Sequence, residues 1–488
     1  MSGGTTSAFA PPANPSKYGL LLLTVSLSSI LAPLNSTMLA VALPELRDDF
    51  NVSHAEIAWL VSAYLIVMAV AQPLGGRVGD QLGRAPVLRA GLIAFLAFSI
   101  ACALAPTFPT LILFRSGQAL VGAAAIPNGI AMLRESLPAN RLGRSGGLTG
   151  SAIAIAAAGG PLLGAALLGL GSWRYLFLMN IPLVIAGLVC LTLLRYQSRA
   201  ERKRLSLDWP GAASFAILLA GVTILLTSLR GNESTLVLSG AIVAIVVFGL
   251  VFLHRQLNSE SPIAEWRLFR IRSYAASTMF ILLGNLVMYT TILAVPFFLD
   301  EVQGRGSAAR GILLACVSLP MLVLGPIGGR VSDAVGRRPL VNVGSCLMIV
   351  SMAVLAIGIS EGSSPLFLAA SLAGLGVGMS ISFGAAGAAA AESTPVEVAG
   401  AAAGTNSMMR YLGSIIGTGV LGAVLNTEGV APEIGVFRLV FAVLFVMAVL
   451  AFISSLFIHR FPAERRRSTG VPPVPATAGA SAPGPVTG

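Results

Sequence analysis

The chain has 488 residues, of which 55% are hydrophobic and 10% are charged, whereas charged residues make up about a quarter of an ordinary soluble domain. This composition excludes a soluble globular fold. The net charge is +11, but the two lysines, Lys17 and Lys203, do not follow a glycine-rich turn, so the sequence does not predict a nucleotide-binding P-loop.

A membrane helix needs roughly 20 apolar residues to cross a hydrocarbon core about 30 Å thick. Apolar runs of this kind recur along the chain, separated by short polar loops. The pattern predicts an all-α integral membrane protein with fourteen transmembrane helices. These helices are expected at residues 18–43, 57–75, 87–105, 108–133, 146–170, 175–194, 211–229, 235–253, 275–299, 311–329, 340–358, 366–391, 399–425 and 436–458.

The basic residues are divided unevenly between the two sides that the alternating loops define. Twenty-three lysines and arginines fall on the side that holds both termini, and six fall on the other side. Because loops rich in Lys and Arg stay in the cytoplasm, both termini are expected there. Contact with lipid explains the charge, so no nucleic-acid partner is expected. Arginine-rich, lysine-poor usage suggests a GC-rich bacterial genome, and the predicted location is a bacterial cytoplasmic (inner) membrane.

Two motifs occur twice along the chain. The sequence PLGGRVGD at 73–80 recurs as PIGGRVSD at 326–333, and ESLP at 135–138 recurs as ESTP at 392–395. The offsets, 253 and 257 residues, are nearly equal, which predicts two pseudo-symmetric six-helix bundles with two inserted helices. The predicted organisation is a cytoplasmic tail at 1–17, an N-terminal bundle at 18–195, a linker with the inserted helices at 196–273, a C-terminal bundle at 274–460 and a disordered cytoplasmic tail at 461–488.

Two similar bundles that meet around a cavity near the membrane midplane are the arrangement of secondary transporters, in which one half rocks against the other. Transport is therefore the function that this architecture predicts. A membrane enzyme is the competing class, but a nucleophile needs a nearby base or metal. The three histidines are scattered among loop positions and the four cysteines lie singly in apolar runs, so we expect no catalytic site, no metal site and no cofactor.

Three segments resemble a known family. Residues 76–84 (GRVGDQLGR) resemble the loop signature of the major facilitator superfamily. Residues 159–164 (GGPLLG) resemble the antiporter signature of its drug-export branch, and residues 173–182 (WRYLFLMNIP) resemble the start of span six in its fourteen-span drug/proton antiporters. The similarity runs from about residue 19 to residue 460.

The resemblance implies a secondary active transporter that exports small amphipathic organic compounds, drugs or metabolites, by alternating access and proton antiport. The implied partners are a small-molecule substrate, protons and the lipid bilayer, and we expect a monomer. The antiporter motif consists of Gly159, Gly160, Pro161 and Gly164. Small residues at this spacing also allow helices to pack closely, which is the alternative interpretation of the motif.

The repeated loop motifs form a candidate conformational gate. Their glycines allow tight turns, and an aspartate beside the next helix start favours the helix dipole. The resemblance implies that the arginines pair with acids across the bundle interface and hold the cytoplasmic side closed. Helix capping together with topology charge is the alternative. The gate residues are Gly76, Asp80, Gly83 and Arg84, with Asp333 and Arg337 in the second copy.

A candidate transport cavity is centred on Arg115 in span four, because an arginine buried in a membrane costs at least a few kcal/mol and normally faces a cavity or a partner. The stretch around it resembles the family's Arg-x-x-Gln-Gly signature, which places this arginine beside the path of substrate and protons. Many of the other polar side chains also suit helix packing. The candidate cavity residues are Asn35, Tyr64, Arg115, Gln118, Asn285, Tyr289, Asn406 and Arg410.

Asn35 departs from the resembling subfamily, whose span one carries an aspartate at this place. An amide cannot titrate, whereas a carboxylate in the membrane is the usual proton carrier. The nearest acidic alternatives are Asp300, Glu301, Asp80 and Glu392. This departure motivates a second hypothesis, a facilitator or exchanger of the same fold that moves neutral or anionic small molecules without proton coupling.

Overall fold

The computed structural model describes residues 15–137, 139–196, 208–228, 235–258, 266–394, 399–425 and 433–460. Within these ranges the chain forms helices and no strand. The predicted tails lie outside the described residues, apart from residues 15–17. The helices up to residue 194 are α1 (Pro15–Phe50), α2 (His54–Leu82), α3 (Arg84–Ala103), α4 (Phe108–Gly122), α5 (Ala125–Ser136), α6 (Ala139–Leu168), α7 (Arg174–Leu178) and α8 (Asn180–Leu194).

The remaining helices include two short turns, the 3₁₀ turn η1 and the π-helical turn η2. They are α9 (Trp209–Ser228), α10 (Thr235–Asn258), η1 (Trp266–Arg270), α11 (Arg272–Phe297), η2 (Phe298–Val302), α12 (Ser307–Val335), α13 (Arg337–Gly358), α14 (Pro365–Glu392), α15 (Ala399–Leu425) and α16 (Ile434–Ser455).

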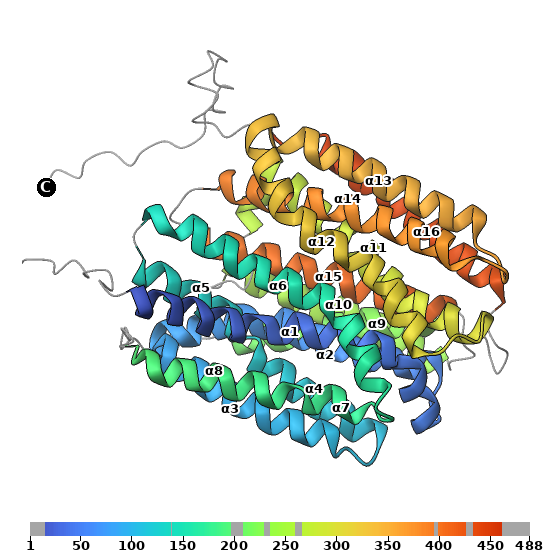
Figure 1. Ribbon diagram of the computed structural model, residues 1–488, viewed down its shortest axis with the longest axis horizontal. Helices are drawn as coiled ribbons and strands as arrows, with labels where there is room; N and C mark the ends of the chain where they lie inside the picture. Colours follow the sequence, from blue (N-terminus) through green and yellow to red (C-terminus); the bar gives the residue numbers. More distant parts are fainter. Residues whose placement is uncertain are drawn as a thin grey trace, which may run out of the picture.

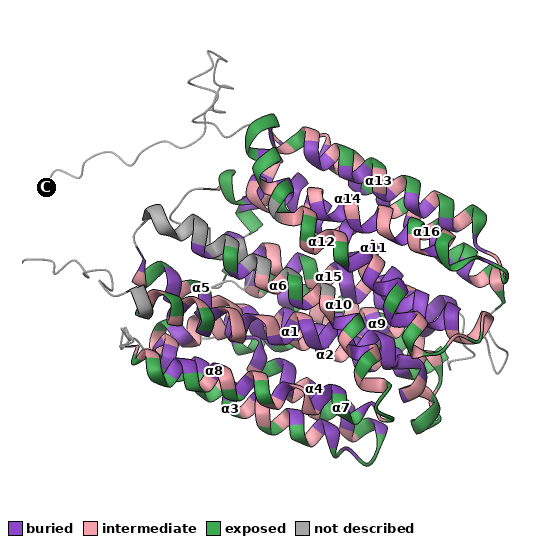
Figure 2. Ribbon diagram, viewed as in Figure 1, coloured by how far each residue is buried: buried purple, intermediate pink, exposed green. Residues whose placement is uncertain are grey.

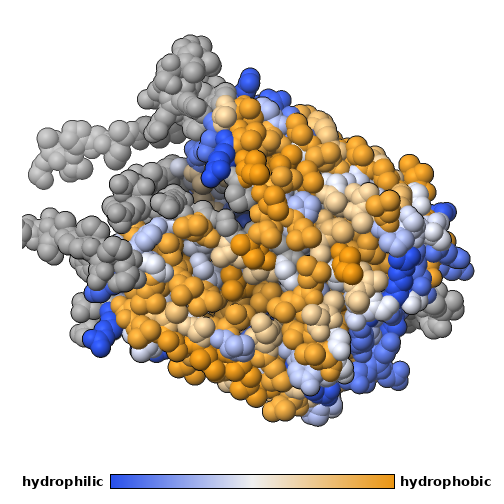
Figure 3. All heavy atoms as spheres, in the orientation of Figure 1, coloured by the Kyte–Doolittle hydropathy of each residue, from blue (hydrophilic) through white to orange (hydrophobic). Residues whose placement is uncertain are grey.

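Thirteen helical segments of the described chain are long and apolar enough to cross a membrane. The predicted fifth span lies in α6, whose apolar part, Ile155–Leu168, is shorter. Each of the fourteen predicted spans coincides with a helix or with consecutive helices such as α4 and α5. Figure 3 shows an apolar surface across the middle and hydrophilic residues towards the two ends. The predicted all-α membrane fold is confirmed.

The helices form two groups with matching contacts (Figure 1). In the N-terminal group, α1–α8, helix α1 packs against α6 and α8, as α11 packs against α15 and α16 in the C-terminal group, α11–α16. Helix α3 packs against α4 and α8, as α13 packs against α14 and α16. The groups meet through α6 with α12 and α2 with α15, which are also counterparts, and through α1 with α11. The molecule is therefore two pseudo-symmetric six-helix bundles.

The inserted helices α9 and α10 break this symmetry. Helix α9 packs against α2 and α15, one of the two contact lines between the groups, and α10 packs against α9. Leu226 and Thr227 of α9 lie against Gly419 and Gly422 of α15, where an added Cβ would come within 2.9 Å of Leu226 and 3.0 Å of Thr227. Most of α10 is exposed and apolar, and such a surface suits contact with lipid. Figure 2 shows exposed residues on other outer helices as well, such as α3 and α13.

An ion pair between a buried aspartate and a partly exposed arginine connects the inserted helices to each other. Asp208 precedes α9 and is almost fully buried. Its Oδ1 accepts hydrogen bonds from Nε and Nη2 of Arg255, at 3.0 and 2.7 Å, and from the backbone N–H of Gly211, at 3.0 Å. The start of α9 is thereby capped and tied to the end of α10.

Successive spans run in opposite directions, so α1 begins at the end of the molecule where α16 finishes. We call this the predicted cytoplasmic end, following the distribution of basic residues. The opposite end, where α1 finishes and α2 begins, is the predicted outer end.

Candidate functional site

Arg115 lies in the middle of α4 with 2% of its surface exposed. Its Nη1 donates a hydrogen bond to Oε1 of Gln118 at 3.2 Å, and its Nη2 donates one to the backbone oxygen of Asn35 at 3.4 Å. Its Cζ lies 4.4 Å from the centroid of the Tyr64 ring and 5.7 Å from that of Phe177. A guanidinium over an aromatic ring gains about 0.5–2 kcal/mol, so rings and neutral oxygens stabilise this charge.

Two buried donors in this cluster have no hydrogen-bond partner among the described residues. They are Nε of Arg115 and the hydroxyl of Tyr64. A buried polar group without a partner costs about 1–3 kcal/mol. A bound molecule with a hydrogen-bond acceptor would remove this cost, so the cluster suits a binding position.

Asn35 forms a reciprocal amide pair with Asn180 of α8. Nδ2 of Asn35 donates to Oδ1 of Asn180 at 2.6 Å, and Nδ2 of Asn180 donates to Oδ1 of Asn35 at 3.0 Å. Both residues are buried. Position 35 therefore holds a neutral, fully paired group. The sequence reasoning did not select Asn180 for the cavity; a lone amide inside an apolar span was the signal that would have found it.

Tyr289 brings the C-terminal group to this cluster. Its hydroxyl lies 3.0 Å from Oγ of Ser36 in α1. Gln118 donates from Nε2 to Oγ of Ser99 at 2.8 Å. The fold thus brings together five of the predicted cavity residues around the α1–α4 contact, namely Asn35, Tyr64, Arg115, Gln118 and Tyr289.

The other three predicted cavity residues behave differently. Asn285 donates to the backbone oxygen of Ile281 in its own helix at 2.8 Å, as a packing residue does. Oδ1 of Asn406 is buried without a hydrogen-bond partner. Arg410 is exposed. The second predicted membrane arginine is therefore not a buried charge.

Arg84 is the centre of the first gate motif. It forms ion pairs with Asp80 and with Glu135, the latter at 3.2 Å, and its Nη1 donates to the backbone oxygen of Gly76 at 2.9 Å. Gly83 has a φ of 94°, a conformation that strains residues with a side chain. Gly83 thus allows the sharp turn from α2 into α3 that brings Arg84 back to Asp80.

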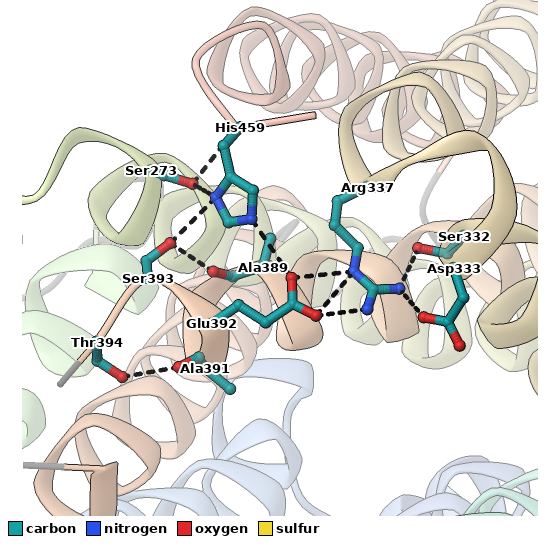
Figure 4. Close-up of polar contacts among 10 residues, drawn as sticks. All are labelled: Ser273, Ser332, Asp333, Arg337, Ala389, Ala391, Glu392, Ser393, Thr394 and His459. Atoms are coloured by element: carbon teal, nitrogen blue, oxygen red, sulfur yellow. Dashed lines mark hydrogen bonds and ion pairs between the residues drawn. The ribbon is translucent and has the colours of Figure 1, made fainter. Parts of the chain in front are cut away.

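The second gate motif builds an equivalent cluster (Figure 4). Arg337 pairs with Asp333 at 2.5 Å and with Glu392 at 2.5 Å, and it donates to Oγ of Ser332 at 2.9 Å. Gly336, with a φ of 104°, makes the corresponding turn. Within each group, the loop motif therefore contacts the second repeated motif, because the arginine that follows the loop motif pairs with the glutamate of the second motif.

Each cluster is completed by a residue that follows the last helix of its group. The hydroxyl of Tyr196 donates to Oε2 of Glu135 at 2.6 Å. Nε2 of His459 lies 3.4 Å from Oε2 of Glu392, and its Nδ1 lies 2.6 Å from Oγ of Ser273 (Figure 4). Burial and the hydrogen bond to Glu135 raise the pKa of Tyr196, so the phenol stays a neutral donor.

In this structure the expected pairing of Arg84 and Arg337 across the bundle interface is not found among the described residues. The acids that the structure places on Arg84 and Arg337 belong to the same group as each arginine. The physical reason is proximity: α5 packs against α2 and α3, and α14 packs against α12 and α13, so the glutamates at their ends are the nearest anions.

The ion pairs that do join the two groups, within the described chain, lie at the predicted outer end. Glu301 of η2 pairs with Arg47 of α1, and its Oε1 lies 2.5 Å from Nε2 of His54 at the start of α2. Arg310 of α12 pairs with Glu45 of α1. From the sequence, Glu301 was expected only as an acid near the end of a span, because its partners Arg47 and His54 belong to the other repeat.

The antiporter motif places α6 between α1 and α12. Gly160 and Gly164 face α1, and a Cβ added at Gly164 would lie 2.6 Å from the backbone oxygen of Met38. On the other side, a Cβ added at Gly311 of α12 would lie 3.0 Å from the backbone oxygen of Pro161. Missing side chains thus allow close backbone approach both within the N-terminal group and between the groups.

Comparison with known proteins gives a consistent family. The sequence profile of the Major Facilitator Superfamily matches residues 25–309 and 279–484. An uncharacterized MFS-type transporter of Bacillus subtilis, YvkA, is 31% identical over 90% of this chain and 96% of its own length. A multidrug resistance protein B homolog of Mycobacterium tuberculosis is 28% identical over 82% of this chain and 75% of its own length.

Two further proteins bear on fold and substrate. The riboflavin transporter RibZ of Clostridioides difficile is 25% identical over 72% of this chain and 75% of its own length. The crystal structure of a D-xylose–proton symporter aligns with a TM-score of 0.66 and 15% identity, over 91% of this chain and 98% of that chain. At this identity the structural match supports the fold alone.

Substituting Gly164 by Ala should destabilise the protein by about 1–3 kcal/mol, because the new methyl group meets the backbone of α1, which cannot move aside. The adjacent control is Gly159→Ala, where a Cβ would meet nothing within 4 Å. Thermal unfolding of the purified variants in detergent measures both. Equal melting temperatures for the two variants would contradict the packing described for α6.

Glu392→Gln should cost more stability than Asp333→Asn. Both remove a carboxylate from the Arg337 cluster, but the Asp333 side chain is 67% exposed, whereas that of Glu392 is 25% exposed and also faces His459. Solvent screens the exposed pair, while a partly buried one is worth about 1–3 kcal/mol. Denaturation of both purified variants is the measurement; the reverse order of stability would refute the assignment of Glu392 as the central acid.

Proposed function

Because the chain belongs to the Major Facilitator Superfamily, we propose that it is a secondary active transporter that exports small amphipathic organic compounds by alternating access and proton antiport. We further propose that it belongs to the fourteen-span drug/proton antiporters. The multidrug resistance name of one relative and the GGPLLG motif in α6 support export over uptake.

The observation that carries the proposal is the cluster around Arg115. A buried cation lies over the Tyr64 ring, with two buried donors that lack partners in the protein. An amphipathic molecule with an acceptor group and an apolar body fits such a place, since its acceptor meets the donors and its body meets the rings. Tyr289 from the C-terminal group reaches the same place, so movement of one group against the other changes it.

The proposed moving units are residues 18–195 and 274–460. The Arg84 and Arg337 clusters hold the helices within each unit together, because their ion pairs stay inside one group. The pairs of Glu301 and Arg310 with α1 and α2 join the units at the predicted outer end. This distribution of ion pairs supports a conformation that is closed on the outside. The proposed location is the bacterial cytoplasmic membrane, with both termini in the cytoplasm.

A second candidate function is supported by the Asn35–Asn180 pair. A neutral amide stands where the resembling subfamily carries an aspartate, and its one oxygen and both of its N–H donors are occupied within the protein. A facilitator or exchanger of neutral or anionic molecules needs no proton carrier there. The riboflavin transporter among the relatives supports this candidate, because its name states a transported vitamin and no drug.

An efflux screen across antimicrobial compounds, in a host that lacks its own exporters, tests the proposed function. Cells that express the protein should tolerate and export at least one compound class better than empty-vector cells. In such cells Arg115→Ala should reduce export by about tenfold or more, because a hydrogen bond to a charged group is worth about 1.5–3 kcal/mol.

Two further variants complete this test. Arg115→Lys keeps the charge and should retain part of the export, and Arg89→Ala, which removes an exposed arginine of α3, should match the wild type. Unchanged export by Arg115→Ala at normal expression would reject the Arg115 cluster as the transport site.

Collapse of the pH gradient distinguishes the two candidate functions. Everted membrane vesicles that carry the protein should stop accumulating the screened compound when a protonophore is added, because an antiporter draws its driving force from the proton gradient. Accumulation that persists without a gradient, and that instead follows the concentration of compound on the other side, would favour the exchanger.

A further inference from the structure

The acid that responds to protons must lie away from position 35, because Asn35 is an amide within a closed pair. An acid that controls alternating access should meet two conditions. It should contact side chains of both helix groups, and it should be buried, so that a change in its charge strongly changes its interactions. Acids of the gate clusters contact their own group in the pairs described above, and Asp208 pairs with Arg255 within the inserted helices.

Glu301 meets both conditions. It belongs to η2 of the C-terminal group, and its Oε1 is bonded to Arg47 of α1 and lies 2.5 Å from Nε2 of His54 in α2. Its side chain is 7% exposed. A carboxylate this far from water interacts strongly with the cations beside it, since little solvent screens the attraction.

The second oxygen of Glu301 has no hydrogen-bond partner in the part of the chain that the structure describes. Oε2 is buried and accepts no hydrogen bond, so a proton can add there without displacing any bond of the protein. Adding it removes the charge that attracts Arg47 but leaves Oε1 in place. The neutral carboxyl then offers Arg47 only a hydrogen bond, and the coulombic attraction of the ion pair is lost.

Glu45 also pairs with a cation of the other group and also has a buried oxygen without a hydrogen-bond partner among the described residues, so exposure distinguishes it from Glu301. Glu45 and Asp300 share Arg310 as a partner, and their side chains are 35% and 28% exposed. Water therefore screens both of them more than Glu301. Three further sets of charged side chains lie near Glu301 and its partners. They are Asp48 beside Arg47, the pair of Asp49 and Arg174, and Arg310 with Glu45 and Asp300.

We propose that Glu301 is a proton-binding site whose protonation from the outer water releases α1 and α2 from η2 and opens the predicted outer end. The proton adds to Oε2 and leaves when Arg47 and His54 return. His54 acts in the opposite sense: its protonated form attracts the ionised carboxylate more strongly, so opening on acidification follows Glu301 and not His54. The inference rests on the alternating-access movement of the proposed function.

Distance measurements between spin labels test the movement without any substrate. Labels on cysteines introduced at the exposed positions Leu170 and Gly362, in a variant without the four native cysteines, report the separation of the two groups at the outer end. In lipid nanodiscs the wild-type background should shift to longer distances as the pH is lowered. Glu301→Gln should give the long distances at every pH, and Glu301→Asp should restore the pH response.

Two controls identify the responsible group. His54→Gln should keep the opening on acidification, and Glu433→Gln, which changes an exposed acid at the same end, should behave as the background. Glu301→Gln that stays closed, or a pH response that is lost in His54→Gln and kept in Glu301→Gln, would overturn the proposal.

Infrared difference spectra give a readout of protonation itself. Acidification should produce a carboxyl band that is absent from Glu301→Gln and present in Glu433→Gln; a band unchanged by Glu301→Gln would overturn the proposal. Because neither measurement uses a transported compound, failure here is distinguishable from failure of the efflux screen, which tests the proposed function.

Discussion

Charge cannot be solvated in the hydrocarbon interior, and this constraint orders the whole molecule. The ion pairs described in the structure lie near the ends of helices, while the centre is held by neutral amides, hydroxyls and aromatic rings. Arg115 is the buried exception. Its charge is stabilised by the Tyr64 and Phe177 rings and by neutral oxygens.

The ion pairs at the two ends act on different units. At the predicted cytoplasmic end, the Arg84 and Arg337 clusters connect helices of one group, so they stiffen that group. At the predicted outer end, Glu301 and Arg310 connect the two groups. In the proposed movement, the two groups keep their internal ion pairs and turn against each other where α6 meets α12 and α2 meets α15. The inserted helix α9 lies along only one contact line, so that line carries additional packing.

The exchange of an expected carboxylate for Asn35 changes what the centre can do. An aspartate there would place a titratable charge beside the cluster of Arg115, whereas the amide forms two hydrogen bonds with Asn180 and carries no charge in either partner. The centre is then electrostatically constant when pH changes. Under the proposal made for Glu301, the dependence on protons comes instead from an acid at the helix ends that meets cations of the other group.

The sequence by itself determined the all-helical membrane fold, the twofold repeat and the place of Arg115 inside an apolar run, because hydropathy, repeated motifs and a charge within an apolar run are local properties of the chain. The tertiary structure alone decided the partners: Asn180 for Asn35, Glu135 for Arg84, and Arg47 with His54 for Glu301. These pairs join residues far apart in sequence, and their formation depends on which helix faces pack together, which the order of residues along one helix does not specify.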